Sequence, residues 1–353
     1  MKTTATTTHF ACLLRVLCAL LCSVMAGVNA TGSAEKPVPP AVSLSRNYTR
    51  LAQIGADTFA MEIAVRTFTP TTGKGATITL ISAVHIGSKA YYTRLQELLD
   101  AQTLVFVEGI AGDPPATQEE DSGGSDLYDR LAEASGLVSQ AEAIEYDREH
   151  FKNADLSLGA MREILQAEID GGGKGGAAAK EALSLLNETA GMLKGKGGFA
   201  TLVMSAFAGM MQSNPQLRTL FLYKVSMAEL TMTEHDNASA FSSLTSTPGL
   251  RRLERLLLID RNAAVMNALK KELARANAPS DIGVFYGAAH MRDMEKTLVR
   301  QMGYKLVKTE WLTAYTIHPK ASKLPGPIIA VISRSAAKIS PPAESHRPAQ
   351  ATK

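Results

Sequence analysis

The sequence predicts an α/β fold, in which a central mixed, largely parallel β-sheet of two βαβ-type halves is flanked by helices and carries a helical insertion. Apolar runs at 76–84 and 104–107 enclose a helical pattern at 89–101, so a strand, a helix and a strand follow within about thirty residues, the length of a βαβ unit. A further strand-like run at 281–286 is again followed by a helical pattern, at 291–302. The repeated order indicates two related halves.

The first half begins with a predicted β-hairpin. Residues 59–68 alternate between apolar and polar side chains, 69–75 have the composition of a turn, and 76–84 are more continuously apolar. This pattern predicts a second strand that is buried on both faces. Ser88 is a suitable N-cap for the helix at 89–101. We expect a right-handed crossover and a parallel partner strand at 104–107.

The middle of the chain, from about 126 to 249, is predicted to be a helical insertion. Helical patterns cover 126–134 and 156–167, and a glycine-rich break at 171–176 precedes an alanine-rich helix. The Met-rich apolar run at 199–211 is too short to span a bilayer. It is either a buried helix or an exposed apolar lid.

The predicted α/β domain covers 46–333, and its last third again alternates between helix and strand. A long amphipathic helix is expected at 250–276, and strands are expected at 304–316 and 328–333. Residues 334–353 are rich in Ser, Ala, Pro and Lys without periodicity, which predicts a disordered basic tail.

The N-terminus has the features of a secretory signal peptide over residues 1–30. Lys2 precedes an apolar run at 11–26, and Val28-Asn29-Ala30 places suitable residues before a cleavage site. A polar linker at 31–45 follows. We therefore expect an exported protein, periplasmic or secreted, with no stable membrane span after cleavage. Retention as an uncleaved anchor and lipoprotein processing at Cys22 are the alternatives.

Cysteine content and charge exclude several classes of function. The three cysteines, Cys12, Cys18 and Cys22, all lie in the predicted signal, so the mature chain is expected to be cysteine-free. A thiol nucleophile, a thiolate metal site and an iron–sulfur cluster are thereby excluded. The formal net charge is +3, and no basic stripe is interleaved with aromatic residues, so we expect no nucleic-acid partner.

Three polar residues follow predicted buried strands. His85 follows 76–84, Glu108 follows 104–107, and His290 comes shortly after 281–286. Ligands of open parallel sheets bind beyond these strand ends, and adjacent strands lie only about 4.8 Å apart, so His85 and Glu108 can share a centre if their strands are neighbours. Two imidazoles and a carboxylate form an open metal site that activates water. Without metal, a histidine oriented by Glu108 can be the general base. Spacing leaves both mechanisms open.

Arg261, on the predicted long helix, is the fourth candidate. It is either an arginine paired with Asp260 or Glu254, or a charged fork that stabilises an oxyanion or holds a substrate carboxylate. Other histidines are weaker candidates: His150 and His235 have polar neighbours and are expected at the surface, and His318 and His346 lie near or in the C-terminal segment. The sequence contains neither a GxSxG elbow nor a P-loop, which argues against serine hydrolases and NTPases.

These residues resemble the TraB/GumN (Tiki-like) superfamily, which also takes in erythromycin esterase-like and ChaN-like proteins. The resemblance covers roughly 51–317. The motifs that carry it, in the family's order, are Ser82-Ala83-Val84-His85, Val105-Phe106-Val107-Glu108, Ile259-Asp260-Arg261-Asn262 and Gly287-Ala288-Ala289-His290. Ser82 departs from the family pattern, which has glycine there.

The resemblance implies an α/β metallohydrolase, dependent on manganese or cobalt in Tiki members. His85, Glu108 and His290 would form the catalytic or metal centre, and Arg261 would assist the transition state. Erythromycin esterase-like members are assigned water activation by histidine without metal, and ChaN-like members bind haem. The expected function is therefore an exported, metalloprotease-like or esterase-like hydrolase of peptide or ester bonds. The alternatives are a non-catalytic haem or apolar-ligand binding protein, favoured by the Met-rich run, and an interaction protein with a relict site, favoured by Ser82.

Overall fold

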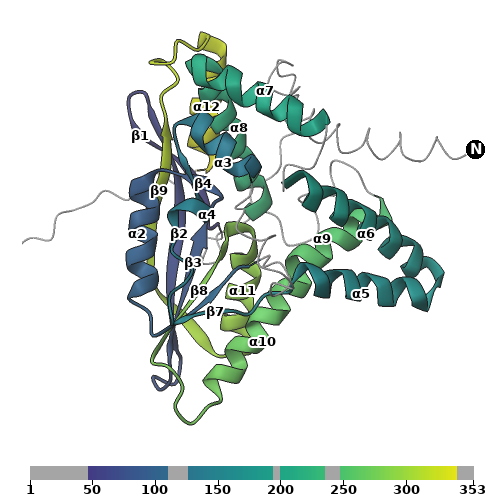
Figure 1. Ribbon diagram of the computed structural model, residues 1–353. Helices are drawn as coiled ribbons and strands as arrows, with labels where there is room; N and C mark the ends of the chain where they lie inside the picture. The colour runs from purple at the N-terminus through teal and green to yellow at the C-terminus, as the bar shows by residue number, and fades with distance from the viewer. Residues whose placement is uncertain (1–46, 110–125, 194–198, 235–246, 340–353) are drawn as a thin grey trace, which may run out of the picture.

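The computed structural model describes residues 47–109, 126–193, 199–234 and 247–339. The predicted signal peptide at 1–30 and the linker at 31–45 lie outside the described residues, as do all three cysteines and residues 340–353 of the predicted tail. Within the described ranges, the architecture is a mixed sheet flanked by helices, which confirms the predicted α/β class (Figure 1).

Among the described residues, the main sheet has seven strands, and β2 runs opposite to the six others. β1 and β3 share one edge of the long strand β2, while β9 covers its other edge; beyond β3 the order is β8, β5 and β7. The strands are β1 (Thr49–Gly55), β2 (Thr58–Pro70), β3 (Thr77–Ala83), β5 (Leu104–Val107), β7 (Phe151–Asn153), β8 (Asp281–Gly287) and β9 (Tyr304–Ile317).

The predicted hairpin is confirmed, because β2 and β3 are antiparallel neighbours. The predicted strands at 104–107 and 281–286 are present as β5 and β8. The expectation that β3 and β5 are neighbours is wrong, since β8 lies between them and pairs in parallel with both. A crossover helix fixes only that its two strands run parallel, so it leaves room for a strand from much later in the chain. The second predicted half also differs from a βαβ unit, because the strand after its helix, β9, pairs with β2 and not with β8.

Helices cover both faces of the sheet (Figure 1). α2 (Lys89–Asp100) lies on one face, and Ser88 caps it as predicted by accepting a hydrogen bond from the Tyr91 N–H. α10 (Arg261–Leu273) and α11 (Ala288–Gln301) pack on the other. β8 shows why both faces are apolar: Phe285 belongs to the core beneath α2, and its neighbour Tyr286 belongs to the core beneath α10 and α11. Alternation along a strand sends successive side chains to opposite faces.

The predicted insertion is largely helical but contributes to the sheet as well. β7 joins the edge of the main sheet, and β6 (Val138–Ser139) pairs with the two-residue strand β4 (Ile86–Gly87). α5, α6 and α9 form a core of their own and project from the sheet (Figure 1). The helices are α3 (Asp126–Ser135), α4 (Gln140–Ala143), α5 (Leu158–Gly171), α6 (Gly173–Leu193), α7 (Phe199–Ser213), α8 (Pro215–Glu234) and α9 (Pro248–Arg255).

The glycine-rich break predicted at 171–176 is confined to Gly172 and Gly173, whose φ angles of 72° and 68° are open to glycine. α6 begins at Gly173, so the remaining glycines of this stretch are helical. None of the helices in the described ranges combines the length and the apolar composition that a bilayer crossing requires.

The C-terminal strand predicted at 328–333 is wrong, as is the start of a disordered tail at 334, because 326–339 form the helix α12 (Gly326–Ile339). A short apolar run does not distinguish a strand from a buried helix. Here Ile332 and Ala336, four residues apart, are buried on one helical face. Pro325 and Pro327, at the start of this segment, are compatible with a helix N-terminus.

Candidate active site

The predicted site residues gather at the C-terminal ends of neighbouring parallel strands. His85 follows β3, Glu108 follows β5, and His290 lies in the first turn of α11 directly after β8. In the register of the sheet, Ala83 is opposite Gly287. Because β8 lies between β3 and β5, the residue that the sequence placed last, His290, belongs between the two others.

Glu108 is the centre of this arrangement. Its Oε2 accepts a hydrogen bond from the Gly287 N–H at 2.6 Å, and its Oε1 accepts one from Arg261 Nη2 at 2.7 Å. Burial alone would raise the pKa of Glu108, but the charges of His290 and Arg261 and a hydrogen bond from His290 hold it well below its ordinary value. Glu108 is therefore an ionised carboxylate that is largely enclosed, with 14% of its side chain exposed.

Arg261 lies between two carboxylates, that of the partly buried Glu108 and that of Asp155. Its Nε donates to Asp155 Oδ1 at 2.9 Å, and its Nη2 donates to both Asp155 and Glu108. Only 4% of the Arg261 side chain and 0% of the Asp155 side chain are exposed. The proposed partner Asp260 is instead bound by Arg252 at 3.0 Å. Arg261 thus holds the position of Glu108.

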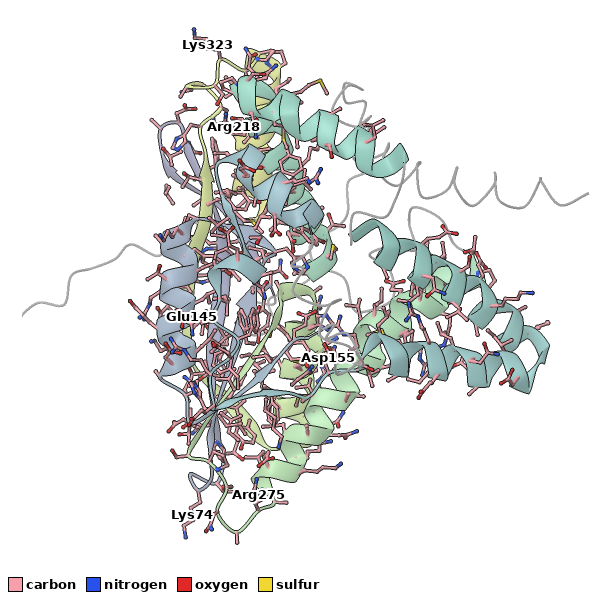
Figure 2. The ribbon with its side chains drawn as sticks, viewed as in Figure 1. Lys74, Glu145, Asp155, Arg218, Arg275 and Lys323 are labelled. Atoms are coloured by element: carbon pink, nitrogen blue, oxygen red, sulfur yellow. The ribbon has the colours of Figure 1, made fainter. Side chains whose placement is uncertain are left out.

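A π-helical turn at Leu256–Asp260 immediately precedes Arg261. Such turns insert one extra residue into a helix, and they are frequent at functional sites. This one joins α9 to α10 and turns both Arg261 and Asn262 toward the sheet, where both are buried. Asp155 reaches Arg261 from the junction of the sheet with α5 and α9 (Figure 2).

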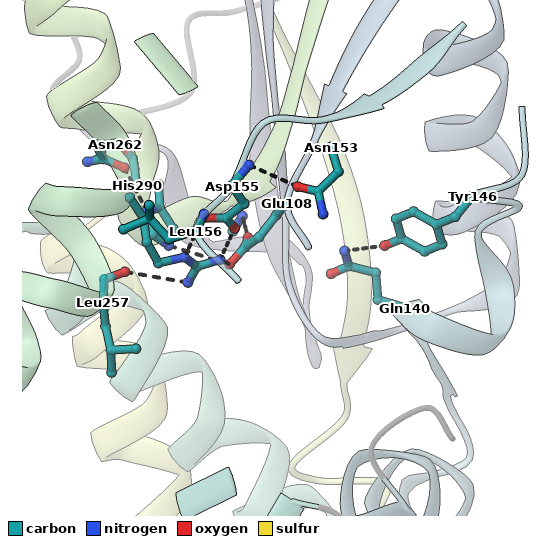
Figure 3. A network of polar contacts seen from close by, with 11 residues as sticks. Glu108, Gln140, Tyr146, Asn153, Asp155, Leu156, Leu257, Asn262 and His290 are labelled. Atoms are coloured by element: carbon teal, nitrogen blue, oxygen red, sulfur yellow. Dashed lines mark hydrogen bonds and ion pairs between the residues drawn. The ribbon is translucent and has the colours of Figure 1, made fainter. Parts of the chain in front are cut away.

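The orientation of His290 is fixed by a chain of hydrogen bonds, of which Figure 3 shows the members Asn262 and His290. Asn262 Nδ2 donates to Asp293 Oδ2 at 3.0 Å, and Asn262 Oδ1 faces His290 Nδ1 at 2.7 Å. The contact between Asn262 Nδ2 and the Asp293 carboxylate sets which way the Asn262 amide points, so its Oδ1 is the acceptor that faces His290 Nδ1. The other ring nitrogen, Nε2, lies 3.5 Å from Glu108 Oε1. His290 is therefore held between two acceptors.

The surroundings of the His85 ring contrast with those of the His290 ring, which is held between two acceptors. The residue is exposed, and its ring forms no hydrogen bond with the described residues; the Tyr128 ring lies against it at 4.7 Å between centroids. Protein nevertheless surrounds the ring on several sides, and this desolvation lowers the pKa of His85. The charges of His290 and Arg261 lower it further, whereas Glu108 raises it. Near neutral pH we therefore expect an uncharged imidazole that is open to a ligand.

Ser82, which departs from the resembled motif, is fully buried. Its Oγ donates a hydrogen bond to the Ala64 carbonyl on β2. The hydroxyl is satisfied within the sheet and does not occupy the space around His85, so the serine is compatible with an intact site.

Several residues of the site were not predicted. Asp155, Asn262 and Asp293 complete the hydrogen-bond chains, and Tyr128 packs on His85. Asn262 follows Arg261 directly and was visible as part of its motif. Asp155 follows β7, whose three residues are too few for a periodic signal.

The other candidate histidines lie elsewhere or outside the described residues. His150 Nε2 contacts the Leu99 carbonyl at 3.3 Å, and His318 contacts two threonines. His235 and His346 fall outside the described residues. For the Met-rich run at 199–211 we expected either a buried helix or an exposed apolar lid, and helix α7 has features of both. It buries Phe207 and Met211 and exposes Leu202 and Met210.

In this arrangement, the side chains of His85, Glu108 and His290 do not fit the predicted metal centre. Within the described ranges, no three His, Cys, Asp or Glu side chains lie together in a way that could hold a metal ion. Glu108 directs one oxygen at Arg261 and the other at the Gly287 N–H. A cation at Glu108 would therefore compete with a guanidinium that is already in place.

The fold and the site define a broad class of protein. It is an α/β protein whose strand ends hold an ion-paired glutamate (Glu108), an oriented histidine (His290) and an exposed histidine (His85). Comparisons of the chain with protein-family models, with curated proteins and with solved structures found no match. The geometry of the site must therefore carry any proposal about function.

Proposed function

We propose that this chain is an exported hydrolase of peptide or ester bonds, of the kind that the TraB/GumN resemblance implies, in which histidine activates water. The observation that carries the proposal is the contrast between two histidines beside one buried carboxylate. His290 is held between the acceptors Asn262 and Glu108, whereas His85 is exposed and its ring forms no hydrogen bond among the described residues. Paired groups in contrasting environments are suited to separate acid and base roles.

His85 is the general base in this mechanism. An uncharged imidazole that is open to solvent can accept a proton from a water molecule as that water attacks the substrate carbonyl carbon. Desolvation supports this role, because it lowers the pKa of His85 and keeps the ring unprotonated near neutral pH. The Tyr128 ring beside it limits the positions that the imidazole adopts.

His290 is the general acid. With Nδ1 bound to Asn262, its Nε2 is the nitrogen that can donate a proton to the departing amine or alcohol. Water adds to the carbonyl carbon, the bond to the leaving group breaks, His290 supplies the leaving group's proton, and His85 holds the proton taken from water. Transfer of that proton from His85 to His290 restores both histidines, and the net change is consumption of one water.

Glu108, Arg261 and Asp155 position these groups. The Glu108 carboxylate lies 3.5 Å from His290 Nε2, and Arg261 and the Gly287 N–H hold this carboxylate in place. This role differs from the oxyanion fork that was one expectation for Arg261, because the Arg261 contacts go to carboxylates and to the Leu257 carbonyl.

The resemblance also implies a manganese or cobalt ion at His85, Glu108 and His290. Such an ion would supply an activated water when bound. Because the donors do not fit an ion in the present arrangement, we derive no step through it.

The proposal is tested by His85→Gln, His290→Gln and Glu108→Gln, assayed on panels of peptide and ester substrates. His150→Gln is the matched control, since His150 contacts the Leu99 carbonyl away from the site. We expect the three site variants to remain folded and to lose at least about 100-fold in kcat/KM, while the control retains its rate. Activity that survives in all three site variants would refute the proposal. Chelator treatment should leave the wild-type rate unchanged, and restoration of a lost rate by added Mn²⁺ would favour the metal-dependent mechanism.

A further inference from the structure

A cavity of about 340 Å³, partly open to solvent, lies where α3 ends, α8 begins and the chain leaves β9. α8 contributes Arg218 and Thr219 to its lining, Gly136 follows α3, and Ser322 belongs to the turn after β9. None of the candidate active-site residues is among the described residues that line it. Cavities of this size accommodate small molecules, so this one is a candidate binding site separate from the active site.

The guanidinium of Arg218, at the start of α8, has donors that the protein does not use (Figure 2). Its Nη2 donates to the Gln212 carbonyl at 3.1 Å, whereas its Nε is buried without a hydrogen-bond partner among the described residues. Its Nη1 reaches the cavity wall at Gly136, 3.8 Å from the position that a Cβ atom would take there. No described carboxylate forms an ion pair with Arg218. An arginine with unused donors in a cavity wall is suited to bind an anion.

Two hydroxyl groups line the same cavity. The Oγ atoms of Thr219 and Ser322 lie 2.6 Å apart, and neither forms another hydrogen bond with a described residue. Only one hydroxyl donates in this contact, so the other keeps a proton for a further acceptor. Apolar side chains, among them Leu137 and Leu222, form another part of the lining. The cavity thus offers donors for an acidic group and an apolar surface for the rest of a molecule.

The basic residues of the lining are Arg218 and His318, and no acidic residue of the described ranges lines the cavity. Glu133 on α3 lines a different hollow, which shares only Leu137 with this one. Both carboxylate oxygens of Asp57 accept backbone N–H groups of the turn after β9. The first turn of α8, which also lines the cavity, adds partial positive charge. The cavity is therefore complementary to an anion.

We propose that this cavity binds a small organic carboxylate with an apolar body, and that Arg218 pairs with the carboxylate. One guanidinium balances the single charge of a carboxylate and binds it through charge-assisted hydrogen bonds. The free hydroxyl proton of the Thr219–Ser322 pair supplies a further donor, and the apolar wall at Leu137 and Leu222 takes up the hydrocarbon part. This binding site is independent of the proposed hydrolase function.

Isothermal titration calorimetry with hexanoate and with hexanamide, which has the same chain length and no charge, tests the proposal. Wild-type protein should bind hexanoate at least about tenfold more tightly than hexanamide, and Arg218→Gln should bring the two affinities together. Arg334→Gln is the matched control, since Arg334 is exposed, donates to the Ala330 carbonyl and does not line the cavity. Equal wild-type affinities, no binding of hexanoate, or unchanged hexanoate binding by Arg218→Gln would overturn the proposal.

A second measurement locates the binding in the wild-type protein, so it tests the proposal even if Arg218→Gln does not fold. In an NMR titration with hexanoate, the backbone amide signals of Gly136, Thr219 and Ser322 should shift. Shifts confined to other parts of the chain would refute the site. A parallel titration with inorganic phosphate tests the class of anion: phosphate that binds at these amides more tightly than hexanoate would contradict the assignment to carboxylates.

Discussion

Replacing Arg261 with methionine tests the buried ion network most severely. The variant keeps an unbranched apolar stem but removes the guanidinium that binds both Glu108 and Asp155. Both carboxylates then remain in the interior, where 14% and 0% of their side chains are exposed. Two like charges that share a desolvated site strongly disfavour double ionisation.

The expected loss of stability follows from this burial. Removing one partner of a buried ion pair costs about 3–5 kcal/mol in the free energy of unfolding, because the remaining charge is left uncompensated. Arg261 compensates two charges, so we expect the upper part of that range. Arg255→Met provides the control: its side chain is 68% exposed, it lies 3.9 Å from Asp260, and such surface pairs contribute about 0–1 kcal/mol.

Urea denaturation followed by circular dichroism measures both variants. Arg261→Met should unfold at a clearly lower urea concentration with an unchanged slope, whereas Arg255→Met should follow the wild type. The difference between Arg261→Met and wild type should shrink as the pH falls below the ordinary carboxyl range, because protonation of a carboxylate relieves the repulsion. Equal midpoints for Arg261→Met and Arg255→Met at neutral pH would refute the account of the network.

Three further predictions concern single groups. Glu108→Gln should lower the NMR titration midpoint of His85 below its wild-type value, because the charge of Glu108 raises the pKa of His85; an unchanged or higher midpoint would contradict this. Ser82→Gly should cost about 1–2 kcal/mol in unfolding experiments through one lost buried hydrogen bond and a more flexible strand, with no change in kcat; a loss of activity would show that the hydroxyl has a functional role. Glu229 has a folded pKa of about 7 against an ordinary 4.5, so its contribution to stability is lost as the pH rises between these values; Glu229→Gln should match wild type at pH 4 and exceed it by about 1–3 kcal/mol at pH 8, and equal stability at both would contradict the inferred burial.

Much of the sheet was predictable because its elements carry local signals. The apolar runs at β3, β5 and β8 and the capped helix α2 were correctly placed, since burial on both faces and an N-cap leave short-range patterns. The position of β8 between β3 and β5 was not predictable. It depends on pairing between segments about 200 residues apart, and the crossover rule does not specify which strands are neighbours. α12 was mistaken for a strand because its apolar run is short.

The candidate site was likewise predictable only in part. His85, Glu108 and His290 were identifiable because each follows a buried strand, and Arg261 because of its apolar helix. The partners that fix their roles, Asp155 and Asn262, come from a short strand and from a helix that contains a π-turn. Contacts of this kind are tertiary, so the sequence left open whether Arg261 is a paired arginine or an oxyanion fork. Its partners are the carboxylates of Glu108 and Asp155.

The central claim is that His85 and His290 take part in one hydrolytic step, and the double variant His85→Gln/His290→Gln tests it most directly. Groups that act together in one step give strongly non-additive losses in kcat/KM. We predict that each single variant loses at least about 100-fold and that the double variant is no slower than the slower single variant. A double variant whose loss equals the product of the two single losses, or single variants that retain the wild-type rate, would contradict the account.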